Sequence, residues 1–252
     1  MLDIKKITDI YLQYVRENFN LSDTNLMRKY KHVQKVAEYA FEIAKSLNLN
    51  EEDRALAYVC GLFHDFGRFF QWREYGTYYD LQSFDHAKRG IELLFDQGLI
   101  KRFDIPEKYY MVLKTSLAEH NKINLSPELK DERLILFSKI LRDADKLNLY
   151  ELNISGELPT FTEIDGVTIE VLDAIKNGVP VNKYIVKTKL DRALLSLATT
   201  YDLNFEYSFK KLIDIHYYEG LYDRFLKILK DDDCRLLNEC IIIAKRYLKD
   251  KI

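Results

Sequence analysis

The chain has 252 residues, of which 47% are hydrophobic and 31% are charged, so it is long enough for one large domain or two small ones with a substantial core. Its 38 basic and 40 acidic side chains leave a formal charge of −2, which argues against a nucleic-acid polymer or an anionic membrane as partner. Nine Gly and four Pro are few for this length and indicate long regular elements.

The start of the chain and its cysteines give no sign of export. The first six residues lack the apolar core of a signal peptide, and no apolar run approaches the ~20 residues that a membrane span needs. Cys60, Cys234 and Cys240 are odd in number and lack Cys-x-x-Cys spacing, which argues against a disulfide framework and a zinc–thiolate site. We therefore expect a cytoplasmic protein.

Helical periodicity dominates the first part of the chain. Residues 24–47 repeat their apolar positions every 3.6 residues, and His32 lies at the edge of that apolar face. Residues 55–63 are apolar on nearly every side, which is typical of a buried central helix, and they lead directly into His64 and Asp65. A buried imidazole and a buried carboxylate need partners, and a metal ion is the most economical one.

The next elements are expected to be shorter. Gly67 is expected to end the buried helix, and residues 68–80 are interpreted as an aromatic loop. Ser83 can cap a helix that carries His86 and ends at Gly98.

Two further helices complete the first part. Pro106 suits the first turn of a helix that ends near His120. Ser126, which precedes a proline, is expected to open a long helix that carries Asp143 and Asp145.

Turn residues gather in the second part, between residues 155 and 181, around a short helical stretch at 169–175. Helicity is expected to resume after Asn182 in three segments, and the last, residues 231–249, opens with three aspartates and ends with basic side chains, as the helix dipole favours. These patterns predict one all-α domain over residues 1–252, with a helical C-terminal extension.

Four histidines and two aspartates stand out by their order along these helices. They are His32, His64, Asp65, His86, His120 and Asp145. Neutral imidazoles and carboxylates are ligands that suit divalent first-row metals, and six of them can hold two ions. The sequence therefore predicts a helical cage around a metal site.

This set resembles the HD-domain superfamily of metal-dependent phosphohydrolases. The matching segments are KHVQKVA around His32, GLFHDFGR around His64 and Asp65, DADKL around Asp145, FDHA around His86 and AEHN around His120. The resemblance covers about residues 25–152, and it places the metal-binding core at about 20–152 and the helical extension at about 153–252.

The resemblance implies an HD-type helical bundle in which His32, His64, Asp65 and Asp145 hold one divalent ion. Asp65 could bridge to a second ion, since the remaining two histidines look like the extra pair of members that hold two metals or grip phosphate. The expected cofactor is one or two ions of Mn, Mg, Fe, Ni or Zn. Such an ion lowers the pKa of bound water and counters charge on phosphoryl oxygens.

Two assignments stay open at this point. Asp143 and Asp145 lie on opposite flanks of one apolar stripe, so periodicity does not choose between them; the family pattern selects Asp145 and leaves Asp143 to orient a ligand histidine. Arg68 stands three residues after Asp65, where some nucleotidases of the superfamily carry a catalytic carboxylate. Its guanidinium could hold a phosphate or form a surface salt bridge. We take Asp65 and Arg68 as the candidate catalytic residues.

The expected activity is hydrolysis of a phosphate ester, as a phosphomonoesterase or phosphodiesterase, with a nucleotide or another small phosphorylated metabolite as substrate. A di-iron oxygenase on the same fold is the alternative, and a non-catalytic nucleotide-sensing module is the second. A homodimer is compatible with the sequence.

Three expectations concern residues outside the ligand set. His216 is expected to be a hydrogen-bonded core residue. The cations Lys88, Arg89 and Lys122 are expected to be solvated. Leu158–Asp165 directly follows the helix of Asp145, so it is expected to line or cover the mouth of the site, with a surface connector as the alternative.

Overall fold

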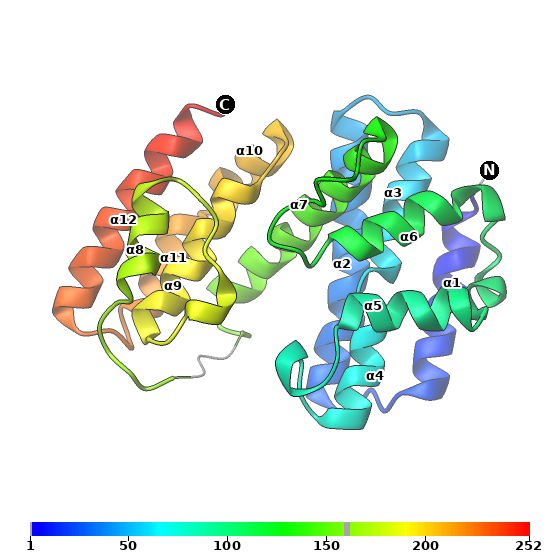
Figure 1. Ribbon diagram of the computed structural model, residues 1–252, viewed down its shortest axis with the longest axis horizontal. Coiled ribbons are helices and arrows are strands. Elements are labelled where there is room, and N and C mark those ends of the chain that lie inside the picture. Colours follow the sequence, from blue (N-terminus) through cyan, green and yellow to red (C-terminus); the bar gives the residue numbers. More distant parts are fainter. Residues whose placement is uncertain (1, 159–161) are drawn as a thin grey trace. The chain divides into compact units, whose positions relative to one another are not determined.

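The computed structural model describes residues 2–158 and 162–252, and within these it is built from helices without a strand (Figure 1). The predicted all-α fold is therefore confirmed. The chain divides into two compact units, Met1–Asp145 and Lys146–Ile252, and the division falls within helix α7 (Glu132–Ile154). That the two units act as one domain stays a prediction.

Unit 1 consists of six helices and the first part of α7. They are α1 (Ile4–Asn18), α2 (Thr24–Ser46), α3 (Glu51–Phe63), α4 (Phe66–Tyr75), α5 (His86–Ile91) and α6 (Tyr110–Glu119). Short 3-10 or π-helical turns cover residues 80–82, 92–96, 99–103 and 107–109. The buried helix α3 packs against α1, α2 and α6 (Figure 1).

Two glycines bring the helices of the site close together. A Cβ added to Gly61 of α3 would lie 2.6 Å from the Cα of Ala37 in α2, so only glycine permits this approach. A Cβ added to Gly67 of α4 would collide with the backbone oxygen of His86 at the start of α5. Gly67 therefore lies inside a helix and allows close packing, and the expectation that it ends the buried helix was wrong.

An aromatic core supports the end of α3. Phe63 and Phe66 flank the His64–Asp65 dipeptide, and both are fully buried. Their rings lie 4.7 and 6.0 Å from the ring of Tyr11 in α1, centroid to centroid, and Phe103 joins the same cluster. The dipeptide is thereby held in the interior of unit 1.

Three boundaries differ from the expected ones. Residues 68–75 are helical because Phe66, Phe69 and Phe70 form an apolar stripe, and the helix ends at Gly76 in the left-handed conformation (φ 64°). The N-terminal cap of α5 is Asp85 and not Ser83: the Asp85 carboxylate accepts hydrogen bonds from the backbone amides of residues 87 and 88.

The long helix α7 also starts later than expected. It begins at Glu132, and the carboxylate of Asp131 accepts the amide of Leu134, as an N-terminal cap does. Ser126 instead lies in the loop between α6 and α7 and donates its hydroxyl to Glu119.

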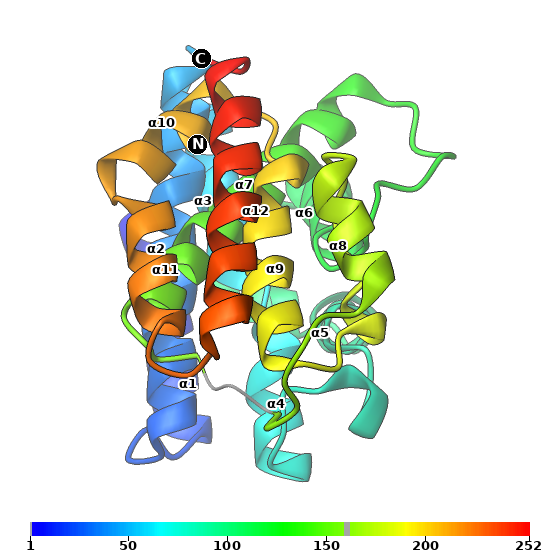
Figure 2. The ribbon, with the colours of Figure 1, turned by 90° about the vertical axis from the view of Figure 1, so that its left-hand side faces the viewer.

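Unit 2 contains the rest of α7 and five further helices. They are α8 (Ile169–Lys176), α9 (Lys189–Ala198), α10 (Glu206–Asp214), α11 (Tyr217–Phe225) and α12 (Asp231–Lys249). Helix α12 packs against α8, α9 and α11 (Figure 2). Four α-helices thus follow Asn182, where three were expected, because a turn at His216 (φ 50°) separates α10 from α11.

The segment Leu158–Asp165 lies partly outside the described residues, since 159–161 are not among them. Its described part is held within unit 2: Thr162 donates to the carbonyl of Lys187, and Asp165 pairs with Lys189 and Lys230. That the segment covers the site stays a prediction. No helix of the described residues has both the length and the apolar character needed to pass through a membrane.

A candidate metal centre of four histidines and two aspartates

The first half of the site joins the middle of α2 to the end of α3. His32 and His64 are buried, and their Nε2 atoms lie 3.2 Å apart. The Oδ2 atom of Asp65 is 3.5 Å from the His32 Nε2 and 3.4 Å from the His64 Nε2. Asp145 in α7 completes this group with its Oδ1, at 3.2 and 3.6 Å from the same two nitrogens.

The second half joins the start of α5 to the end of α6. The Nε2 atoms of His86 and His120 lie 3.1 Å apart, and both side chains are buried. The Oδ1 atom of Asp65 is 3.4 Å from the His86 Nε2 and 3.8 Å from the His120 Nε2. Asp65 therefore belongs to both groups and directs one oxygen to each pair of histidines.

The hydrogen bonds on the far side of the rings fix which nitrogens carry a proton. His64 and His120 each place Nδ1 2.7 Å from a backbone carbonyl oxygen, of Gly61 and Leu117, and a carbonyl can only accept. The Nδ1 of His86 lies 3.0 Å from both oxygens of the Asp80 carboxylate. In their neutral forms these three imidazoles direct Nε2 lone pairs into the centre.

Lone pairs that converge in this way repel one another unless a cation lies between them. In the second half, the neutral forms of His86 and His120 would face each other with two lone pairs at 3.1 Å. A divalent ion in each half removes this conflict and matches the nitrogen and oxygen donors present. The residues therefore fit one or two divalent metal ions.

The charges of the site agree with this donor set. Burial lowers the pKa of His86 to about 4, with the nearby Arg68 guanidinium adding to the effect, so this imidazole is neutral at neutral pH, as a metal ligand must be. Burial would raise the pKa of Asp65 and of Asp145, but their basic neighbours outweigh it and hold both well below the usual range.

His64 is different. Burial would lower its pKa, but the carboxylates of Asp65 and Asp145 outweigh burial and raise it to about 9. Without a metal, His64 thus carries a proton that an entering ion must displace.

Asp145 places its carboxylate beside His32 and His64, as its expected role as a ligand requires. Its side chain is 21% exposed, so it marks the side of the site that solvent reaches. Asp143 is fully buried in α7, and its expected role in orienting a histidine stays a prediction.

Arg68 lies next to the site but is held by other partners. Its Nη1 donates to Gln71, to the carbonyl of Tyr78 and to Asp80, at 2.6, 2.6 and 2.7 Å, while its Nε lies 3.7 Å from Asp65. Asp80 in turn holds the His86 ring. Asp80 was not predicted, because it lies six residues before His86 in a short 3-10 turn that carries no periodic signal.

Two further cations contribute to the site without having been predicted. Lys29 places its Nζ 2.6 Å from the Oδ2 of Asp65, and its spacing of three residues from His32 on one helix was the available signal. Arg142, a buried cation in the apolar face of α7, donates to the carbonyls of Glu119, Lys122 and Ile123 and thereby fixes the segment after His120.

The cations that were expected to be solvated are at the surface of unit 1. Lys88 is exposed, Arg89 pairs with Glu92 at 2.9 Å, and Lys122 pairs with Glu119 at 2.7 Å.

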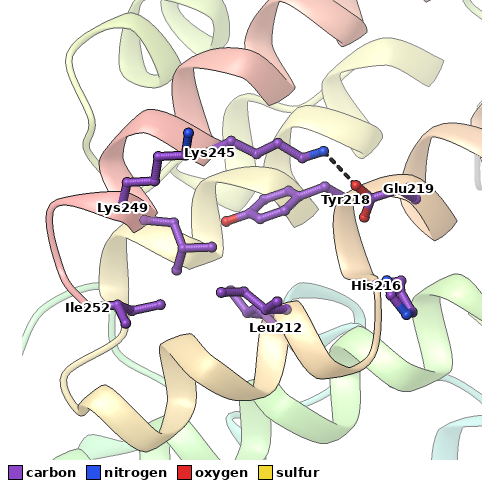
Figure 3. Close-up of a pocket in the computed structure, with 9 residues that line it drawn as sticks. Leu212, His216, Tyr218, Glu219, Lys245, Lys249 and Ile252 are labelled. Carbon is purple, nitrogen blue, oxygen red and sulfur yellow. Dashed lines mark hydrogen bonds and ion pairs between the residues drawn. The ribbon is translucent and has the colours of Figure 1, made fainter.

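The fifth histidine, His216, belongs to unit 2 and is exposed, so its assignment to the core was wrong. It stands at the edge of an open pocket of about 400 Å³ between α10, α11 and the end of α12 (Figure 3). Leu212, Leu248 and Ile252 line the pocket, and the Lys245 ammonium beside it is bonded to Glu219 at 2.5 Å.

Comparison with known proteins gives one match. Residues 30–149 match the family model of the HD domain, and this range contains all six candidate ligands. No curated protein and no solved structure matches the chain. Residues 30–149, just under half of the chain, therefore resemble an HD domain, and the buried histidines and aspartates within this range converge in two groups that share Asp65.

Proposed function

We propose that the chain is a metal-dependent phosphohydrolase that cleaves a phosphate ester of a nucleotide or another small phosphorylated metabolite. The observation that carries this proposal is the position of Asp65, whose two oxygens face two separate pairs of imidazole Nε2 atoms. A carboxylate shared in this way suits two neighbouring ions, which is the arrangement that clamps both oxygens of an in-line displacement at phosphorus.

His32, His64 and Asp145 would hold one ion, His86 and His120 the other, and Asp65 both. The ions would supply an acidified water and neutralise charge on the phosphoryl oxygens. The protein itself would hold the ligands in position and exclude water from them. Five of the six candidate ligand side chains are nearly inaccessible to solvent, and Asp145 is the partly exposed one. Such a centre works by position and electrostatics, as phosphoryl transfer requires.

The aromatic side chains beside the centre support a small planar substrate. The rings of Trp72 and Tyr78 lie 4.9 Å apart, and the Lys29 ammonium lies 5.4 Å from the centroid of the Tyr78 ring. Lys29 also bonds Asp65, so this aromatic pair adjoins the first half of the site. A nucleobase could pack there while its phosphate reaches the metals.

Metal analysis followed by a substrate screen tests the proposal. The purified chain should contain a divalent metal, and the metal-free protein should regain phosphate-ester hydrolysis with at least one of Mn, Mg, Fe, Ni and Zn. His64→Ala and Asp65→Ala should lose metal and activity, whereas His216→Ala, an exposed histidine outside the cluster, should keep both. Full activity of Asp65→Ala with metal still bound would contradict the proposal, as would bound iron that supports only an oxygen-dependent reaction.

A further inference from the structure

Lys29 lies at the edge of the first half-site, one helical turn before His32 on α2. Its ammonium bonds the Oδ2 of Asp65 at 2.6 Å, and its side chain is only 14% exposed. The ring of Tyr78 lies beneath it at 5.4 Å, and the Tyr78 hydroxyl donates to the backbone oxygen of Asn25 in the same helix. The ammonium is thus held in place from two sides.

The oxygen that Lys29 bonds is the one that faces His32 and His64. Asp65 is also the only carboxylate within 4.0 Å of this ammonium among the residues that the structure describes. An ion in the first half-site would share that oxygen with Lys29. The ammonium would then stand beside the ion with two of its three N–H donors not used by Asp65.

A positive side chain in this position does not help to hold a metal, because like charges repel at such short range. It does suit an anion that binds the metal and the ammonium together. Arg68 lies on the other oxygen of Asp65 and farther away, with its Nε at 3.7 Å, and its Nη1 is bonded to Gln71, Asp80 and the Tyr78 carbonyl. Lys29 is therefore the nearer cation to the first half-site.

We propose that Lys29 is the phosphate-binding side chain of this site and that the substrates are phosphate monoesters. Resting on the proposed function, this inference narrows it to one substrate class. The two half-sites and the Lys29 ammonium form three positive positions close to Asp65, and the Arg68 Nε lies farther away, at 3.7 Å. A monoester phosphate has three non-bridging oxygens, one for each position, whereas a diester has two, so one of its oxygens would have to serve two positions.

The experiment measures the binding of inorganic phosphate to the Mn-loaded full chain by titration calorimetry, with metal content determined in parallel. Lys29→Met should bind phosphate about 10- to 100-fold more weakly, as expected for the loss of a charge-assisted hydrogen bond, and should keep its metal. Lys29→Arg should stay within a few-fold of the wild type. Lys31→Met, which removes the same charge from an exposed position on the same helix, should bind as the wild type does.

Unchanged phosphate affinity in Lys29→Met would overturn the inference, as would a loss of metal in this variant, which would mean that Lys29 only supports Asp65. If Lys29→Met does not fold, Lys29→Gln, which keeps a donor to Asp65, replaces it with the same expected loss. A wild type that prefers bis(p-nitrophenyl) phosphate over p-nitrophenyl phosphate would overturn the substrate class.

The proposed function can fail separately. If phosphate binding depends on Lys29 but the chain hydrolyses no ester, the role of Lys29 in binding phosphate is supported and the proposed hydrolase function is wrong. If Lys29→Met hydrolyses esters with an unchanged rate and KM, the proposed hydrolase function is supported and the role of Lys29 in binding phosphate is wrong.

Discussion

At the scale of single residues, the second half-site depends on the hydrogen bond between Asp80 and His86. Both Asp80 oxygens lie 3.0 Å from the His86 Nδ1, and Arg68 holds the carboxylate from the other side at 2.7 Å. A carboxylate behind a ligand imidazole fixes its tautomer and orientation and increases its basicity. Asp80 is therefore a positioning residue for the second ion.

Asp80→Asn should weaken the binding of the second ion about 10- to 100-fold and leave the first unchanged, because Asp80 holds His86, a ligand of the second half-site. Metal titration with Mn would show one tight and one weakened site. Asp85→Asn is the matched control, since Asp85 caps α5 next to His86 and asparagine caps a helix equally well. Two unchanged sites in Asp80→Asn would mean that the ring is held by packing alone.

His86 and His120 themselves are tested by removing both. The double alanine variant should bind about half as much metal as the wild type, because the first half-site keeps His32, His64, Asp65 and Asp145. Elemental analysis of the purified variant measures this. Unchanged metal content with a raised KM would instead show that the two histidines bind phosphate, and unchanged content and kinetics would show a structural role.

At the scale of helices, the sequence predicted those elements whose signals are local. The expected helix at residues 24–47 matches α2, and the buried segment at 55–63 matches the end of α3. Helix α4 was missed because Gly67 was interpreted as a helix end. A glycine is required there because the position packs against the backbone of His86, a contact that the local sequence does not reveal. Lys29 and Arg142 were missed for the same reason, since their partners are distant in sequence.

Gly61→Ala tests how closely α2 and α3 must pack. The new Cβ would meet the Ala37 backbone, which cannot move aside as a side chain can, so we expect a loss of about 1–3 kcal/mol in the free energy of unfolding and weaker metal binding. Urea denaturation and metal titration measure the two effects. Ala37→Gly should not rescue the variant, because the contact is with backbone atoms; full rescue would place the strain elsewhere.

In unit 2, Asp191 ties the start of α9 to the loop before α8. It is fully buried and accepts bonds from Thr168 and from the amides of residues 187 and 188. Burial would raise the pKa of Asp191, but the bond from the Thr168 hydroxyl and those from the amides outweigh it and lower the pKa. The resulting stabilisation is present above the unfolded pKa of ~3.9 and is lost as pH falls through the folded pKa.

Asp191→Asn should therefore destabilise the chain by about 1–3 kcal/mol at pH 7, because an amide cannot accept all four bonds. The difference from the wild type should shrink as pH falls below ~3.9, where the wild-type carboxylate also loses its charge. Urea denaturation across this range measures it. A difference that is constant with pH would show that the charge of Asp191 is unimportant.

At the scale of the whole molecule, the candidate metal centre belongs to unit 1. All six candidate ligands lie within Met1–Asp145, and the HD family match ends at residue 149, close to the boundary in α7. The family resemblance predicted this part from motif residues alone. It says nothing of unit 2, whose helices could be predicted from periodicity but whose role could not.

Metal should stabilise unit 1 directly, because an ion that binds only the folded site shifts unfolding by mass action, by about 4 kcal/mol at 1,000 times its dissociation constant. Trp72 is the only tryptophan and lies in α4, so its fluorescence reports on unit 1. Chelation with EDTA should lower the unfolding temperature seen by Trp72, and re-addition of Mn should restore it. An unfolding temperature independent of all five candidate metals would contradict a metal site in this unit.

The most direct test of the central claim, that Asp65 joins two metal ions, is the metal content of the wild type and of Asp65→Ala. The wild type, loaded with Mn and freed of excess metal, should hold two ions per chain, and Asp65→Ala should lose binding at both half-sites because each loses its shared oxygen. Asp96→Ala, which removes an exposed carboxylate, should keep both ions. A wild type that holds no metal, or an Asp65→Ala variant that still holds two ions, would contradict the account.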